Sequence, residues 1–361
     1  MNNSDRRKSR AIKLGTIMVG GGAPVTVQTM TKTDTRDTIA TINEIRRLRL
    51  SGCDIIRLAV PDISAAEALR PICEASPIPV IADIHFDHQL ALTAIKNGVH
   101  GLRLNPGNIR SEEKVREVAA AALDRGIPIR VGVNAGSLDP EIKARYGGVT
   151  AAALAESALN EVRRLEKYDF NLIKIAVKAF DIKTMTEAVR IVASECDYPL
   201  HLGVTESGLP EDGIIRSSIG IGSLLLQGIG DTIRVSLTGD SADEVMTGIR
   251  ILKSTGLREA GPVIVSCPTC GRCQIPLQKI AREVQKRLEG VSGSFQVAVM
   301  GCAVNGPGEA EQADFGIAGG KDSGLIFRQG KIIRTLPADQ LVDGLIEEIF
   351  KSLNQGCKSG E

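Results

Sequence analysis

Residues 129 to 134 read Ile129-Arg-Val-Gly-Val-Asn134, which places a cation between two aliphatic residues. Similar triplets recur along the chain, at Ile56-Arg57-Leu58, Leu102-Arg103-Leu104, Ile173-Lys174-Ile175 and Ile233-Arg234-Val235, with His201 in the central position of Leu200-His201-Leu202. Successive side chains of a β-strand point to opposite faces of its sheet. The pattern therefore predicts strands whose aliphatic side chains are covered by helices, while the cations point to the other face.

Strand-like runs alternate with amphipathic stretches over most of the chain. The predicted strands are residues 25–31, 55–60, 79–84, 101–105, 127–134, 172–178, 200–205 and 232–238, and helices are predicted at 38–51, 64–75, 111–125, 149–167, 184–193 and 241–255. Eight such units over about 240 residues match a (β/α)8 barrel. An open, doubly wound sheet is the alternative, but Gln28-Thr-Met-Thr31, after the first strand, lacks the glycine-rich turn of that fold.

A smaller module is predicted to follow the barrel. Its linker is residues 256–262, and the predicted elements are strands at 263–266, 296–300, 325–328 and 331–334 and helices at 274–288 and 340–352. We therefore expect a (β/α)8 TIM-type barrel over residues 1–258 and an α+β domain over residues 259–361.

The composition argues against several classes of partner. Lys and Arg number 44 against 43 Asp and Glu, and aromatic residues make up only 3% with no Trp, so a nucleic-acid partner is not expected. The first ten residues lack the apolar core of a signal peptide, and no apolar run is long enough to span a bilayer. These features predict a cytoplasmic protein with no membrane partner, in which clustered thiols stay reduced.

The cations of the strand pattern point to the interior of the predicted barrel. Burying several like charges is costly unless an anion compensates them. Carboxylates are scarce at the same positions, and Asp83 and Glu206 are the main candidates. The interior is therefore predicted to bind a phosphorylated small molecule, with a diphosphate favoured by the number of cations. Glu206, next to Thr205 at a strand end, is the better candidate for acid–base chemistry, whereas His88 and His100 are expected at the surface.

A cysteine-rich stretch begins the C-terminal module. It reads Cys267-Pro-Thr-Cys270-Gly-Arg-Cys273 and continues after a helix-length segment with Met300-Gly-Cys302-Ala-Val-Asn-Gly-Pro-Gly-Glu309. A C-x2-C-x2-C run with a distant further ligand is close to the bacterial iron–sulfur pattern, although the usual Cys-Pro ending is missing. Four Cys can equally form a structural zinc site. Both alternatives remain open on spacing alone.

These motifs together resemble one enzyme family. With Val27-Gln-Thr-Met-Thr31, Arg103-Leu-Asn-Pro-Gly-Asn108, Arg130-Val-Gly-Val-Asn134 and Val204-Thr-Glu206, and above all with Cys302 to Glu309, the chain resembles the 4-hydroxy-3-methylbut-2-en-1-yl diphosphate synthases along nearly its whole length. The family reduces 2-C-methyl-D-erythritol 2,4-cyclodiphosphate, opening its ring and removing a hydroxyl group, in isoprenoid precursor biosynthesis. The resemblance thus implies an oxidoreductase with a barrel for the diphosphate.

The resemblance also implies roles for individual residues. A [4Fe-4S] cluster is implied on Cys267, Cys270, Cys302 and Glu309. Substrate contacts are implied for Arg57, Arg103, Asn105, Arg130, Asn134, Lys178, Arg234 and Ser236, with Thr205 and Glu206 near the reacting carbons and Glu206 as the proton source. A flavodoxin or ferredoxin is implied as electron donor, and a homodimer in which the cluster and the barrel of one site come from different chains.

Cys273 is a departure from the family motif. Bare spacing would choose this thiol as a ligand before Glu309. The family pattern favours Glu309, because a carboxylate is a harder and weaker ligand of iron than a thiolate and leaves that iron exchangeable.

Overall fold

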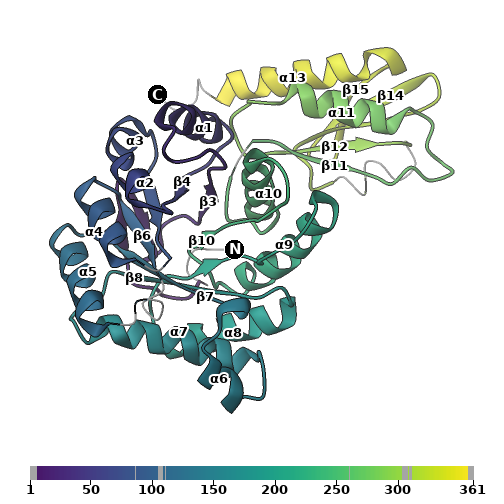
Figure 1. Ribbon diagram of the computed structural model, residues 1–361. Coiled ribbons are helices and arrows are strands. Elements are labelled where there is room, and N and C mark those ends of the chain that lie inside the picture. The colour runs from purple at the N-terminus through teal and green to yellow at the C-terminus, as the bar shows by residue number, and fades with distance from the viewer. Residues whose placement is uncertain are drawn as a thin grey trace. The chain divides into compact units, whose positions relative to one another are not determined.

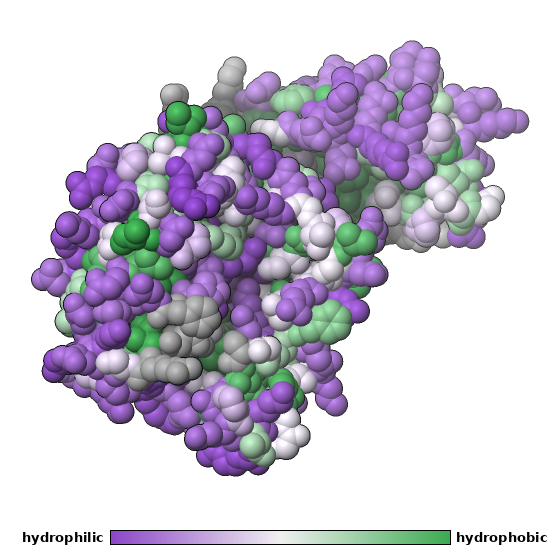
Figure 2. Space-filling view, in the orientation of Figure 1, coloured by the Kyte–Doolittle hydropathy of each residue, from purple (hydrophilic) through white to green (hydrophobic). Residues whose placement is uncertain are grey.

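The computed structural model describes residues 6–85, 87–104, 109, 111–259, 261–302, 308 and 311–356. The chain divides into two compact units, Met1–Arg258 and Glu259–Glu361, and each is described by itself. Hydrophilic residues dominate the face that Figure 2 shows, with apolar residues scattered among them.

The first unit is a closed barrel of eight parallel strands (Figure 1), and it confirms the predicted fold class. In chain order the strands are β3 Thr26–Met30, β4 Ile55–Ala59, β5 Val80–Asp83, β6 Gly101–Leu104, β7 Ile129–Asn134, β8 Ile173–Lys178, β9 His201–Leu202 and β10 Thr232–Ile233. Each strand pairs with the next along the chain, and β10 returns to β3. A bridge between Ile175 and Leu200 joins β8 to β9, which completes the ring.

Helices surround the barrel: α1 Thr38–Leu50, α2 Ile63–Glu67, α3 Leu69–Ala75, α4 His88–Lys96, α5 Glu112–Asp124, α6 Pro140–Arg145, α7 Ala151–Glu166, α8 Ile182–Glu195, α9 Pro210–Leu225 and α10 Ser241–Ser254. Many of these helices are capped at the N-terminus by a side chain that accepts a hydrogen bond from a backbone N–H of the first turn, as Ser111 does for α5 and Thr150 for α7. The aliphatic residues of β7, Ile129, Val131 and Val133, are buried beneath this layer.

The structure corrects three details of the sequence prediction. The helix predicted at 64–75 is two helices, because Pro71 lacks the N–H that would bond to Glu67 and its ring opposes that carbonyl. His88 is buried rather than at the surface. His100 is half-buried, and its Nδ1 accepts a hydrogen bond of 3.1 Å from the Val80 amide.

A hairpin of β1 Ile12–Leu14 and β2 Ile17–Val19 closes the base of the barrel. Its buried residues pack against Ile55 and Ile81, which lie at the starts of their strands. A side chain at Gly101 would come within 2.6 Å of Leu14 Cδ1. This apolar plug seals the end of the barrel where the strands begin, opposite their carboxyl ends.

Over its described residues, the second unit is a five-stranded sheet with the two helices α11 and α13. Its strands, in spatial order, are β11 Val263–Ser266, β12 Gln296–Met300, β13 Phe315–Ala318, β14 Ser323–Arg328 and β15 Lys331–Pro337, and its helices are α11 Leu277–Arg287 and α13 Leu341–Gly356. Both helices share one buried core with β12, β13 and β14 (Figure 1). β13, a four-residue strand, was not predicted from the sequence. The ring of Phe327 packs directly against Gly316 of this strand, where a side chain would collide with it.

Within the described residues, no helix has the length and apolarity that crossing a membrane requires.

The basal plug generates a stability prediction. Leu14 is buried against the barrel strands, so Leu14→Ala should lower the free energy of unfolding by about 2–5 kcal/mol. Lys13→Ala, at the exposed neighbouring position, should change it by less than about 0.5 kcal/mol. Chemical denaturation followed by circular dichroism measures both. Equal stability of the two variants would show that the hairpin does not contribute to the barrel core.

Candidate active site

A cavity of about 230 Å³ opens at the carboxyl ends of the barrel strands. Most of its lining comes from alternate residues of β4 to β8 and from the segments that follow β5, β9 and β10. The lining residues are Arg57, Asp83, His85, Arg103, Arg130, Gly132, Asn134, Ala176, Lys178, Thr205, Arg234 and Ser236. Five of these are cationic, so the cavity brings together residues that are far apart in the sequence.

Strand register explains this convergence. Residues paired across parallel strands point to the same face, and Arg103 pairs with Arg130, which pairs with Lys174. Asp83 is likewise in register with Arg103. The strands therefore point their charged residues into the barrel interior, as their alternation predicts.

Asp83 is the carboxylate at the centre of this group. Its oxygens lie 3.7 Å from Arg57 Nε and 3.3 Å from Arg103 Nη1, and 3.5 Å from His85 Nε2. Burial alone would raise the pKa of Asp83, but the charges of Arg57 and Arg103 and the hydrogen bond from His85 outweigh it and hold the pKa below its usual range. Asp83 therefore stays ionised and holds two of the arginines in place.

Glu244 is a second buried carboxylate that contacts a cavity cation, and it was not predicted from the sequence. It lies on α10, is 2% exposed and sits 3.6 Å from Arg234 Nη2. Its oxygens also accept hydrogen bonds from Thr29 Oγ1, at 2.5 Å, and from the Leu237 amide, at 3.0 Å. The sequence does carry a signal for this residue. Glu244 falls on the apolar stripe of the predicted helix, and in the structure it shares the buried face of α10 with Gly248 and Ile251.

Positive charge still exceeds negative charge in the cavity. Burial lowers the pKa of Arg57 to about 10 and lowers the pKa values of Arg130 and Lys178 well below their ordinary values, with neighbouring cations adding to the effect on each. Several guanidinium nitrogens find no hydrogen-bond partner among the described residues, namely Arg103 Nε, Arg130 Nε and Nη1, and Arg234 Nε. Buried donors of this kind are normally satisfied, so the cavity is suited to an anionic ligand with several oxygen acceptors.

A glycine makes room for Lys178. A Cβ at Gly203 would lie 2.8 Å from Lys178 Nζ and 2.6 Å from the Arg234 carbonyl. Any larger residue would therefore push the lysine out of its place.

The remaining predicted residues of the barrel lie around the mouth. Thr205, Ser236 and Asn134 are partly buried and line the cavity. Glu206 is exposed, is not part of the lining and has a φ of 54°, an uncommon backbone conformation for a residue other than glycine. Asn105 lies outside the described residues.

A polar layer lies deeper in the barrel, below the cavity. Burial lowers the pKa of Lys174 to about 7, with the charge of Arg130 adding to the shift and Asp231 opposing it. His201 Nδ1 lies 2.7 Å from Thr232 Oγ1, and burial lowers the pKa of this imidazole well below its ordinary value. Burial therefore reduces the positive charge that these two groups carry near neutral pH.

Three of the four predicted cluster ligands are described in the second unit. Cys267 follows β11, Cys270 is exposed, and Cys302 follows β12. The Gly301 amide donates a hydrogen bond of 3.2 Å to Cys267 Sγ, which brings the two cysteine loops together. In the part of the chain that the structure describes, no three His, Cys, Asp or Glu side chains are grouped closely enough to hold a metal. Glu309 lies outside that part.

Cys273 has a different environment. Its thiol donates to the Ile275 carbonyl at 3.2 Å, and a Cβ at Gly301 would lie 2.6 Å from its sulfur. The Gln274 amide donates to the Gly301 carbonyl at 2.8 Å. Cys273 is therefore packed against the Gly301 loop.

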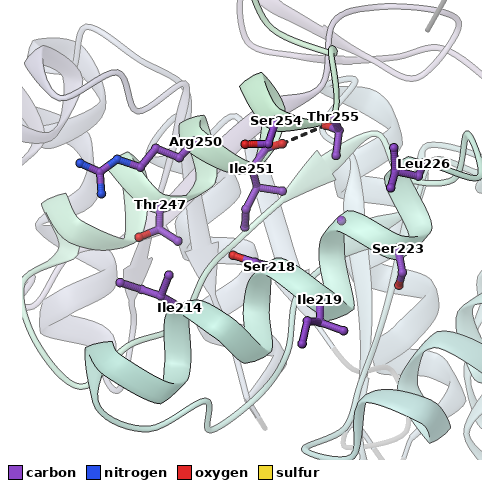
Figure 3. Close-up of a pocket in the computed structure, with 11 residues that line it drawn as sticks. Ile214, Ser218, Ile219, Ser223, Leu226, Thr247, Arg250, Ile251, Ser254 and Thr255 are labelled. Atoms are coloured by element: carbon purple, nitrogen blue, oxygen red, sulfur yellow. Dashed lines mark hydrogen bonds between the residues drawn. The ribbon is translucent and has the colours of Figure 1, made fainter. Parts of the chain in front are cut away.

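A second groove, of about 440 Å³, lies on the outside of the barrel between α9 and α10 (Figure 3). Ile214 and Ile219 project from α9, facing Thr247 and Ile251 of α10. Among the described residues that line it, Arg250 is the one that carries a charge. The described lining of this groove has no acid–base pair and no group of cations, in contrast to the interior cavity.

Comparisons with known proteins follow the same division of the chain. Residues 9–249 match the family model described as the GcpE TIM-barrel domain, and residues 263–351 match the model described as the GcpE protein C-terminal domain.

Two relatives are named 4-hydroxy-3-methylbut-2-en-1-yl diphosphate synthase (flavodoxin). The protein from Geobacter sulfurreducens is 55% identical, over 96% of this chain and 99% of its own length. The protein from Clostridium tetani is 54% identical, with the same two coverages of 96% and 99%.

Two solved structures match about two-thirds of this chain. The 3-dehydroquinate dehydratase of Geobacillus kaustophilus has a TM-score of 0.51 at 15% identity, and the match covers 69% of this chain and 98% of that one. The Yersinia pestis dihydropteroate synthase has a TM-score of 0.50 at 9% identity, covering 68% and 97%. At such identities the likeness is one of fold.

Relatives more than half identical span nearly the whole chain, and the two family models together match most of it. The family predicted from the sequence motifs is confirmed: the chain belongs to the GcpE family, whose curated members carry the name 4-hydroxy-3-methylbut-2-en-1-yl diphosphate synthase.

Proposed function

We propose that this chain reduces 2-C-methyl-D-erythritol 2,4-cyclodiphosphate to 4-hydroxy-3-methylbut-2-enyl diphosphate in isoprenoid precursor biosynthesis. The ring C–O bond to one phosphate breaks, so that the phosphate becomes the free end of a diphosphate. The neighbouring hydroxyl group takes up one proton and leaves as water. Two electrons enter, and a carbon–carbon double bond forms.

The cationic cavity carries this proposal. Five basic side chains surround a space of about 230 Å³, and among the described residues two carboxylates, Asp83 and Glu244, form ion pairs with them. Arginine forks bind phosphate oxygens in a fixed geometry. A cyclic diphosphate offers several such oxygens on a compact ring, so it would satisfy the unpaired nitrogens of Arg103, Arg130 and Arg234.

The chain's own residues would bind, orient and protonate the substrate. Arg57, Arg103, Arg130, Lys178 and Arg234 hold the two phosphates. The side chains of Asn134 and Ser236 line the same cavity and orient the ring. Asn105, outside the described residues, is assigned to the same task by its motif.

Proton delivery is assigned to the segment after β9. Thr205 lines the cavity, and the exposed Glu206 follows it with a left-handed backbone. Such a conformation costs about 1–3 kcal/mol and is often retained at functional sites. Glu206 is therefore the proposed proton donor to the departing hydroxyl group, with Thr205 beside it.

We assign a [4Fe-4S] cluster to Cys267, Cys270, Cys302 and Glu309. The donor set fits, because thiolates suit iron–sulfur clusters, and the Gly301 amide bonds to the sulfur of Cys267 as such ligands require. When bound, this cluster supplies the two electrons of the reaction one at a time. Cys273, whose thiol bonds to a backbone carbonyl, is left out of the ligand set.

The partners follow from the same assignment. A reduced flavodoxin or ferredoxin is the proposed electron donor, in line with the relatives' names. The chain is proposed to act as a homodimer in which the cluster domain of one subunit serves the barrel of the other. Because the assigned ligands require reduced thiols, a cytoplasmic setting is proposed.

The diphosphate-binding assignment is tested at Arg130. Arg130→Met removes charged donors, each worth about 1.5–3 kcal/mol, so the Kd of the cyclic diphosphate should rise by about tenfold to a hundredfold. Arg250→Met, in the groove outside the barrel, is the matched control and should bind normally. Calorimetric titration of the two variants measures the difference. Equal affinities would remove Arg130 from the binding site.

Binding should also be coupled to proton uptake. The pKa of Lys178 is well below its ordinary value in the free protein, and an anionic ligand beside the amine raises it. In the pH range over which this amine titrates in the free protein, the complex should therefore take up a proton, and the binding enthalpy there should depend on the ionisation enthalpy of the buffer. The Lys178→Met variant should take up fewer protons on binding than the wild-type protein. A wild-type enthalpy that is the same in all buffers would contradict this assignment.

The cluster assignment is tested by metal content. Protein purified without oxygen should be brown and contain about four iron atoms per chain. Cys302→Ser should lose the iron, while Cys273→Ser should keep it and its absorption spectrum. Colourless protein with one zinc would support the structural-zinc alternative. Loss of iron from Cys273→Ser, with full activity in Glu309→Gln, would make Cys273 the fourth ligand.

A further inference from the structure

A groove of about 420 Å³ lies in the C-terminal unit between β11 and α11. One wall includes Ile264, Ser266 and Cys267, and the other includes Gln278, Arg282 and Gln285. A proposed cluster ligand therefore lines a groove that is open to solvent.

The helix beside the groove presents a basic stripe. Lys279, Arg282 and Lys286 are exposed and follow one another at spacings of three and four residues, which places them on one side of α11. Glu283 is the acidic residue of this helix, so the exposed charge is mainly positive. Arg287 is already paired with Asp343 and adds little.

The strand beside the groove is suited to a close contact. β11 is an edge strand of the five-stranded sheet, and its Ile264 and Ser266 point into the groove. An apolar side chain such as Ile264 next to a charged rim is a common composition of a protein interface. Electron-transfer complexes bury little surface and form quickly, aided by complementary charge.

We propose that the groove between β11 and α11 is the docking site for the reduced electron carrier, a flavodoxin whose redox group is rimmed by carboxylates. This inference rests on the proposed function and adds the surface through which electrons enter. Arg282 and its neighbours on the stripe attract the carboxylates, while Ile264 and Ser266 of β11 contact the carrier beside its flavin. Cys267, a proposed ligand of the cluster that accepts the electrons, lies in the wall of the groove.

The electron balance requires two encounters for each substrate. Each carrier gives up one electron, is oxidised by one electron and leaves. A short-lived complex steered by charge suits this exchange better than a large permanent interface.

Charge reversal at Arg282 tests the docking site. With reduced flavodoxin as donor at low ionic strength, Arg282→Glu should raise the KM for flavodoxin by about tenfold while kcat stays close to that of the wild type. The difference should shrink as salt is added, because salt screens the attraction. Turnover with dithionite, which needs no docking, should be unchanged.

Lys331→Glu is the matched control. Lys331 is exposed on β15, at the opposite edge of the same sheet, and the substitution makes the same change in charge. It should leave the KM for flavodoxin within about twofold of the wild-type value. Lys286→Glu repeats the test on the stripe if Arg282→Glu binds less iron.

The outcomes separate the two proposals. A KM for flavodoxin unchanged in both stripe variants, with iron content intact, would overturn the docking site and leave the function standing. A shift from dimer to monomer in Arg282→Glu, seen by analytical ultracentrifugation, would assign the groove to a second copy of the chain instead. If the wild-type protein did not turn over the cyclodiphosphate even with dithionite, the proposed function itself would fail.

Discussion

Like charges gathered inside the barrel are the constraint on which the rest of the structure depends. Five cationic side chains share a small cavity, where each lies in the field of the others. Asp83 and Glu244 neutralise part of this charge and fix Arg57, Arg103 and Arg234. The remaining excess is a cost that an anionic ligand relieves, so affinity for a diphosphate and instability of the empty site have one origin.

The fold supplies what this arrangement needs. The barrel points alternate residues of neighbouring strands into its interior, and the apolar hairpin seals the far end. Close packing of α10 on β3, where a side chain at Gly248 would meet Val27, brings Glu244 within hydrogen-bonding distance of Thr29 on the helix-facing side of β3. Rigid strands therefore hold the groups that are proposed to bind phosphate, while the residues assigned to proton transfer lie just beyond a strand.

The sequence predicts the barrel well because alternation along each strand is a local property. Arg57, Arg103, Arg130 and Arg234 could be placed in the interior from their aliphatic neighbours alone. Glu244 could not be placed, because its contact with Arg234 depends on how α10 packs against the barrel. β13 was missed for a related reason: four residues that include a glycine give too short a pattern to identify.

The cysteine region shows a second limit of the sequence. By spacing alone, Cys273 is as good a candidate ligand as Cys267 and Cys270. In the structure its thiol donates a hydrogen bond to a carbonyl and packs against Gly301. That distinction depends on contacts between two loops separated by a helix. The family motif supplied the choice of Glu309, which the spacing of cysteines alone does not indicate.

In the proposed reaction a cationic barrel holds a cyclic diphosphate while electrons reach it from a thiolate-ligated centre. Anaerobic incubation of the purified protein with 2-C-methyl-D-erythritol 2,4-cyclodiphosphate and dithionite, with products identified by phosphorus NMR, tests this directly. We expect an open-chain, allylic diphosphate, formed with the consumption of two electrons per molecule. Recovery of the intact ring, or ring opening without consumption of reductant, would contradict it.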